Sequence, residues 1–97
     1  MTAIIEKLRN DRERILSIAN KYGADNIRVF GSVVRGEETD ASDIDLLVDL
    51  DKDRSLFDLI GLKLELEELT GQTFDVVTQK ALHRLIADQI LKEAVRL

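Results

Sequence analysis

The chain has 97 residues, which is enough for one domain with a hydrophobic core, and we expect residues 1–97 to form that single domain. Its net charge of −5 argues against a surface that coats DNA or RNA, because such a surface needs a basic stripe that displaces counterions. The absence of cysteine excludes disulfides, thiolate metal sites and a cysteine nucleophile. No apolar run approaches membrane-spanning length and the N-terminal residues are too charged for a signal peptide, so we expect a soluble, cytoplasmic protein.

The spacing of hydrophobic residues predicts six elements along the chain. The first is a long helix whose apolar stripe is interrupted at Arg12 and which ends before Gly23, a typical helix C-terminal glycine. Two strands rich in Ile, Leu, Val and Phe follow, and then a segment that alternates like a strand but begins with a capping-box-like Ser55 and Asp58, which favours a helix. With a third strand and a closing helix, the six elements are expected at residues 2–22, 27–30, 43–50, 55–70, 73–78 and 82–95. This order predicts an α/β (α+β) domain with two layers.

The helix expected over residues 55–70 carries two apolar stripes on nearly opposite sides. One stripe has three members and the other has four: Phe57, Ile60 and Leu64, and Leu59, Leu62, Leu66 and Leu69. A helix that lies on a sheet needs only one apolar stripe, so the second would form an exposed patch of the kind that marks an interface. We expect the four-leucine stripe to dock a partner protein or a second copy of the chain; the alternative is that the C-terminal helix covers it.

Acidic residues gather around the start of the second strand, where seven of the 19 carboxylates fall between Glu37 and Asp51. A solvated acidic loop is the plain explanation of such a run. However, Asp43 and Asp45 are two residues apart, so on a strand their carboxylates point to the same face. Such a pair can hold two divalent ions for phosphoryl or nucleotidyl transfer, and Mg²⁺ prefers these oxygen ligands.

Three further positions fit the same chemistry. Asp75 is the only charge in the third strand and could reach the aspartate pair from a neighbouring strand; alternatively it faces solvent on an edge strand. Gly31 and Ser32 follow the first strand, where a glycine lets backbone N–H groups approach a phosphate and the hydroxyl adds a donor. Arg35 could pair with a phosphate, or equally with the acidic side chains that follow it.

The combination of Gly31-Ser32, Asp43-x-Asp45 and a lone Asp75 in a later strand resembles the nucleotidyltransferase superfamily related to DNA polymerase beta. The flanking words GSVVRGE and SDIDLLVD resemble the minimal nucleotidyltransferases (MNT), the antitoxins of HEPN–MNT toxin–antitoxin pairs. The resemblance implies a single minimal nucleotidyltransferase domain with a polymerase beta-like core, in which helices pack on a small mixed sheet. It also implies that Ser32 binds the triphosphate, that the aspartate pair ligates Mg²⁺, and that the third aspartate is a ligand or a base.

By the same resemblance, the chain would transfer AMP from ATP to a hydroxyl, as members of the class do with a tyrosine of the partner HEPN RNase toxin, and so neutralise that toxin. We therefore expect ATP as substrate, two Mg²⁺ ions per site, and a hetero-oligomer with the toxin, without direct contact to nucleic acid or membrane. Two alternatives stay open. One is a binding-only antitoxin that acts by occlusion, and the other is adenylylation of a small molecule, as in aminoglycoside-modifying relatives.

Overall fold

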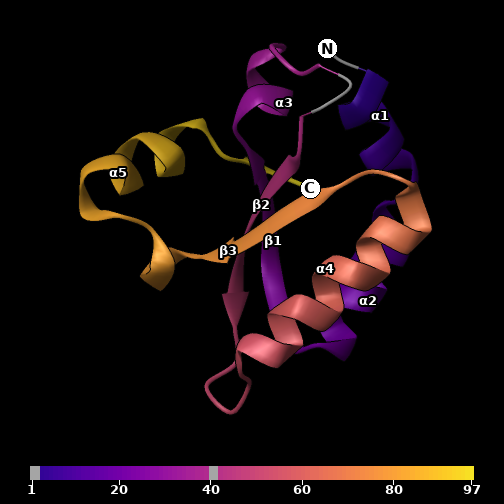
Figure 1. Cartoon of the computed structure of the whole chain (residues 1–97), viewed down its shortest axis with the longest axis vertical. Helices are drawn as coiled ribbons and strands as arrows, with labels where there is room; N and C mark the ends of the chain where they lie inside the picture. Colours follow the sequence, from indigo (N-terminus) through magenta and orange to yellow (C-terminus); the bar gives the residue numbers. More distant parts are fainter. Residues whose placement is uncertain (1–2, 40–41) are drawn as a thin grey trace.

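A four-stranded mixed sheet forms the centre of the computed structural model, which describes residues 3–39 and 42–97 (Figure 1). In chain order the elements are α1 (Ala3–Asn10), α2 (Arg12–Lys21), β1 (Ala24–Phe30), α3 (Ser32–Arg35), β2 (Ile44–Leu50), α4 (Leu56–Thr70), β3 (Phe74–Thr78), the 3₁₀ helix η1 (Gln79–Ala81), α5 (Arg84–Glu93) and β4 (Val95–Arg96). The strand order is β3-β2-β1-β4, with β2 and β3 parallel and the other pairs antiparallel. The predicted α/β class with helices on a small mixed sheet is confirmed.

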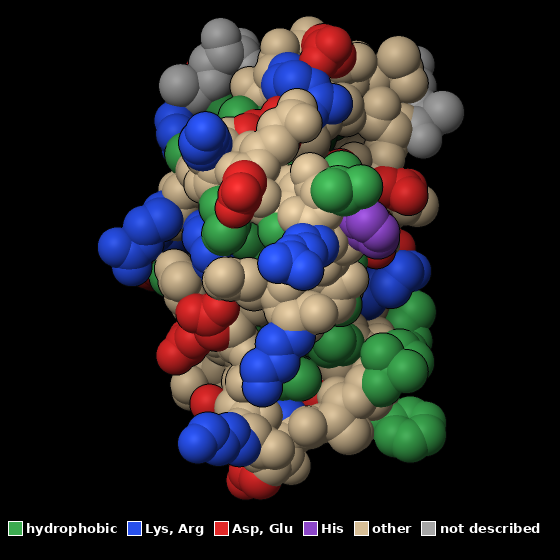
Figure 2. Space-filling model, turned by 90° about the vertical axis from the view of Figure 1, so that its left-hand side faces the viewer, with side chains coloured by type: hydrophobic (Ala, Val, Ile, Leu, Met, Phe, Trp, Pro, Cys, Tyr) green, Lys and Arg blue, Asp and Glu red, His purple; other side chains and the backbone are tan. Residues whose placement is uncertain are grey.

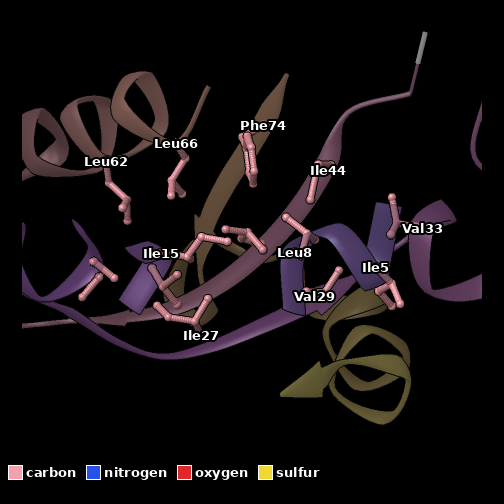
Figure 3. Close-up of a cluster of buried hydrophobic side chains, with 14 residues drawn as sticks. Ile5, Leu8, Ile15, Ile27, Val29, Val33, Ile44, Leu62, Leu66 and Phe74 are labelled. Atoms are coloured by element: carbon pink, nitrogen blue, oxygen red, sulfur yellow. The ribbon is translucent and has the colours of Figure 1, made fainter. Parts of the chain in front are cut away.

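The hydrophobic core lies between the sheet and the helices α1, α2 and α4 (Figure 3). Alternate residues of β2 point into it, and Ile44, Leu46 and Val48 are fully buried. Leu47, which lies between them in the strand, is fully buried as well. Helix α5 lies on the other side of the strands (Figure 1) and buries none of its residues. Its C-terminal end is tied down by β4, which pairs with β1. No helix in the described part of the chain is long and apolar enough to cross a membrane.

The long first helix predicted over residues 2–22 is wrong in one respect, because the chain bends at Asp11 into two helices. The break falls on the polar turn after Leu8, where the stripe has no apolar side chain to hold the backbone to the core. It costs few hydrogen bonds, since the Asp11 N–H still donates to Lys7 O at 3.1 Å and Asp11 O accepts from Ile15 at 2.9 Å.

The expected helix over residues 55–70 is present, and it begins with the predicted capping box between Ser55 and Asp58. The expectation that its four-leucine stripe is exposed is wrong. Leu62 and Leu66 are 0% exposed and point from α4 toward the sheet (Figure 3), while the outer two leucines of the stripe pack against the same core. The other stripe is the exposed one, with Phe57 83% exposed.

The orientation of α4 follows from its contact with α2. Gly61 lies against the ring of Tyr22, and a Cβ at this position would stand 2.5 Å from a ring carbon. Only a glycine allows this approach, and the approach turns the neighbouring Leu62 inward. The alternative, that the C-terminal helix covers this stripe, is not needed either, because α2 and the sheet cover the leucines.

Candidate active site at the start of strands β2 and β3

The sheet register brings two of the candidate aspartates side by side. Asp45 lies in β2 opposite Asp75 of β3 on one side and opposite Phe30 of β1 on the other. Neighbouring strands are about 4.8 Å apart, so the two carboxylates start from adjacent backbone positions. Asp43 immediately precedes β2, two residues from Asp45.

The environments of these carboxylates differ. Asp43 and Asp75 are exposed, whereas Asp45 is partly buried. The pKa of the Asp45 carboxyl is raised from its ordinary 3.8 to about 6, chiefly by burial and then by the negative charges of Asp75 and Asp43. Asp43 is oriented by Thr73, whose hydroxyl donates to the Asp43 carboxylate at 2.6 Å. Nothing local in the sequence marks this partner, which lies 30 residues away.

Gly31 forms the third side of the site. It caps α3 with φ 81° and ψ −154°, a region that is essentially restricted to glycine. A Cβ at Gly31 would overlap the carboxylate of Asp45, so the glycine lets this aspartate lie directly against the backbone. Ser32 is the first residue of α3, next to Gly31, and is partly buried.

Arg35 ends α3 and forms ion pairs with Glu37 and with Glu93 of α5. From the sequence, Arg35 is expected to pair either with a phosphate or with the nearby acidic side chains. In the structure, the carboxylates of Glu37 and Glu93 form ion pairs with its guanidinium. Arg35 lies near enough to Asp45 for its positive charge to oppose the rise in the pKa of that aspartate, while Glu93 adds to the rise. Sequence reasoning missed Glu93, because nothing local marks a contact across 58 residues.

The donor set fits Mg²⁺. Mg²⁺ is usually held by one or two carboxylates together with substrate phosphates, rather than by a complete cage of protein ligands. Within residues 3–39 and 42–97, no three acidic, His or Cys side chains converge into a ready-made metal-binding group. Asp43, Asp45 and Asp75 would therefore hold a Mg²⁺ ion only together with other oxygen ligands, such as those of substrate phosphates.

A separate cavity of about 680 Å³ lies at the opposite end of β2 and β3. It is lined by Val48, Asp49, Leu50, Asp51, Lys52, Arg54, Thr78, Gln79 and Lys80. None of the candidate site residues lines it, so the cavity is not part of the carboxylate site.

Comparisons with known proteins agree with this geometry. Residues 5–97 match the family described as the Nucleotidyltransferase domain. A candidate protein adenylyltransferase of Methanocaldococcus jannaschii is 44% identical over 84 residues, which cover 87% of this chain and 90% of that protein. The protein adenylyltransferase MntA of Thermococcus cleftensis is 41% identical over 78 residues, covering 80% of this chain and 79% of the relative.

The fold is shared with solved structures. A candidate minimal nucleotidyltransferase superimposes with a TM-score of 0.84 at 46% identity, over 95% of this chain and 94% of that one. A toxin–antitoxin crystallised with AMP-PNP has a TM-score of 0.73 at 18% identity, over 89% and 71% of the two chains, which shows the fold alone. The chain belongs to the nucleotidyltransferase-domain family and, within it, to the minimal nucleotidyltransferases.

Proposed function

We propose that this chain is an antitoxin enzyme that transfers AMP from ATP to a hydroxyl, in particular a tyrosine, of a partner HEPN RNase toxin and thereby neutralises it. The observation that carries the proposal is the placement of Asp45 between Gly31 and Asp75, in a chain of the minimal nucleotidyltransferase family. The names of its relatives support the substrate class, because two of those with 40% identity or more are described as protein adenylyltransferases, one of them as a candidate.

The proposed roles follow from position. Asp43 and Asp45 would hold Mg²⁺, with Asp75 as a third ligand or as the base, and the Ser32 hydroxyl and Arg35 guanidinium would donate to the triphosphate. When bound, Mg²⁺ ions, of which we propose two, neutralise the phosphate charge and favour ionisation of the acceptor hydroxyl. The acceptor oxygen attacks the α-phosphorus, the bond to the β-phosphate oxygen breaks, and pyrophosphate leaves. Asp75 is exposed and lies opposite Asp45 in the sheet, which supports a role in taking the acceptor proton.

A protein partner is supported by the surface of α4. Four large apolar side chains are exposed along α4, between its first residue and Leu64: Leu56, Phe57, Ile60 and Leu64. Figure 2 shows hydrophobic side chains projecting from one edge of the molecule, beside charged ones. An exposed apolar patch of this kind is typical of a protein interface, and it is the stripe opposite to the one expected from the sequence.

The experiment incubates the chain with Mg·ATP and the protein encoded by the neighbouring reading frame, and it measures the intact mass of that protein. The expected result is a gain of one or more AMP groups, which disappears in the Asp43→Asn/Asp45→Asn double variant. Calorimetry of ATP binding in Mg²⁺ and in EDTA tests the metal site separately. Equal affinity in the two buffers, or continued AMP transfer by the double variant, would contradict the assigned roles.

Occlusion is the second candidate, and the same exposed patch on α4 favours it, because an apolar surface can neutralise a partner by binding alone. The double aspartate variant separates the two functions in cells that carry the toxin. Loss of protection with retained complex formation supports catalysis as the antitoxic act. Full protection by the inactive variant would assign the antitoxic effect to binding.

A further inference from the structure

Two carboxylates, one near Arg35 in the sequence and one far from it, accept hydrogen bonds from the Arg35 guanidinium. Its Nε donates to Glu37, two residues away, and its Nη1 donates to Glu93 of α5 at 2.5 Å. A guanidinium has five N–H donors in a fixed plane, so these two bonds leave three donors, including both on Nη2, without a partner in the described part of the chain. The side chain is 47% exposed, so these donors can be reached from solvent.

The position of Glu93 is unfavourable except for its bond to Arg35. Glu93 is the last residue of α5, where the negative end of the helix dipole disfavours a carboxylate. Only 15% of its side-chain surface is exposed, and a charge withdrawn from water needs a compensating partner. Among the described residues Arg35 is the cation within ion-pair distance of it.

The pair lies at the same end of the sheet as the candidate active site. The Arg35 N–H donates to Gly31 O at 3.2 Å, so Arg35 follows one helical turn after the glycine that touches Asp45. Resting on the function proposed above, we propose that Glu93 is a positioning residue, which fixes the plane of the Arg35 guanidinium so that its free N–H groups face the phosphates of the bound nucleotide. Glu37 holds the other edge of the same plane.

The proposal predicts an effect of Glu93 that changes with its partner. When Arg35 is present, Glu93 favours nucleotide binding, because it holds the donors in place and less side-chain entropy is lost on binding. When Arg35 is absent, Glu93 is one more negative charge beside a triphosphate and opposes binding. A residue needed only for folding would not show this dependence.

The test measures the affinity for Mg·ATP by calorimetry for the wild type, Glu93→Gln, Arg35→Ala and the double variant, with a thermal melt of each. Arg35→Ala is expected to weaken binding at least about tenfold, the effect of losing a charged hydrogen bond to phosphate. Glu93→Gln should weaken binding by about three- to tenfold in the wild type, since a neutral amide holds the guanidinium less firmly. In the Arg35→Ala background the same change should leave the affinity unchanged or increase it.

The matched control is Glu65→Gln, because Glu65 also forms a long-range ion pair, with Lys21 at 3.0 Å, but on the α2–α4 side of the molecule. It should leave the affinity for Mg·ATP unchanged. If Glu93→Gln fails to fold, Glu93→Asp replaces it, since the shorter side chain keeps the charge but cannot reach Arg35 in the same geometry, and it should weaken binding as well.

Equal weakening by Glu93→Gln in both backgrounds would overturn the proposal, because Glu93 would then act without Arg35. Tighter binding in the wild-type background would overturn it too, since Glu93 would then compete with the phosphates for the guanidinium. Failure of the proposed function is distinguishable from both, because in that case the wild type itself does not bind Mg·ATP.

Discussion

Replacing Gly31 by alanine tests whether the candidate site depends on the close packing of Asp45 against the backbone. The new Cβ meets two obstacles, the glycine-only backbone conformation and the Asp45 carboxylate. A non-glycine residue in such a conformation costs about 1–3 kcal/mol. Pushing the aspartate off its rotamer costs about 0.5–1.5 kcal/mol more. The free energy of unfolding should therefore fall by about 1.5–4.5 kcal/mol, which a protein with about 5–15 kcal/mol of stability can survive.

The matched control is Gly71→Ala. Gly71 also has a positive φ, of 71°, but a Cβ there would have no neighbour within 4 Å. It should lose only about 1 kcal/mol, the ordinary cost of alanine in the left-handed region. In urea denaturation Gly31→Ala should thus be the less stable variant, and it alone should lose AMP transfer.

Asp45→Ala completes a double-mutant cycle, because it removes the group with which the new Cβ collides. In this background Gly31→Ala should cost only its backbone strain, so the two changes should couple by about 0.5–1.5 kcal/mol. The reasoning is refuted if the costs are strictly additive, or if Gly31→Ala is no more destabilising than Gly71→Ala.

Three further predictions concern Asp45, the buried stripe of α4 and the exposed stripe of α4. Because the pKa of Asp45 is raised to about 6, ionisation of this carboxyl opposes folding as the pH rises from about 4 through 6. In EDTA, Asp45→Asn should therefore raise the free energy of unfolding by about 1–2 kcal/mol at pH 7.5, a maximum of about 3 kcal/mol reduced by solvent screening, and should leave it unchanged below about pH 4. A gain in stability that does not depend on pH would disprove this cause. Leu62→Ala and Leu66→Ala should each cost about 2–5 kcal/mol in urea denaturation. Phe57→Lys and Leu64→Lys should each stay within about 0.5 kcal/mol of the wild type and still weaken the complex with the proposed toxin partner in size-exclusion chromatography. An unfolded Phe57→Lys variant would show instead that this stripe is part of the core.

Local patterns predicted the elements that carry the site. The period of a strand correctly put Asp45 on a different face of β2 from its buried neighbours Ile44 and Leu46, which lie in the core. The capping box at Ser55 correctly overruled the strand-like alternation that follows it. In both cases the signal lies within a few residues of the feature, which is why the sequence alone suffices.

Features that depend on distant contacts were not predictable in this way. The two-residue strand β4 is defined by its pairing with β1, and its own residues are exposed, so it carries no periodic pattern. The one-turn helix α3 is too short for a helical period to show. The hydroxyl of Thr73 on Asp43 and the carboxylate of Glu93 on Arg35 become neighbours only when the sheet has formed.

The two stripes of α4 illustrate the same limit with a functional consequence. Both are rich in leucine or other large apolar side chains, so hydrophobicity cannot tell which one faces the core; the choice is made by Gly61 against Tyr22. The exposed stripe lies on α4, whereas the carboxylates lie on β2 and β3, so the proposed partner surface and the proposed catalytic site occupy different elements. Changes at Phe57 should therefore reduce partner binding while Mg·ATP still binds, and changes at Asp45 should do the reverse. Occlusion and AMP transfer can thus be separated on this one domain.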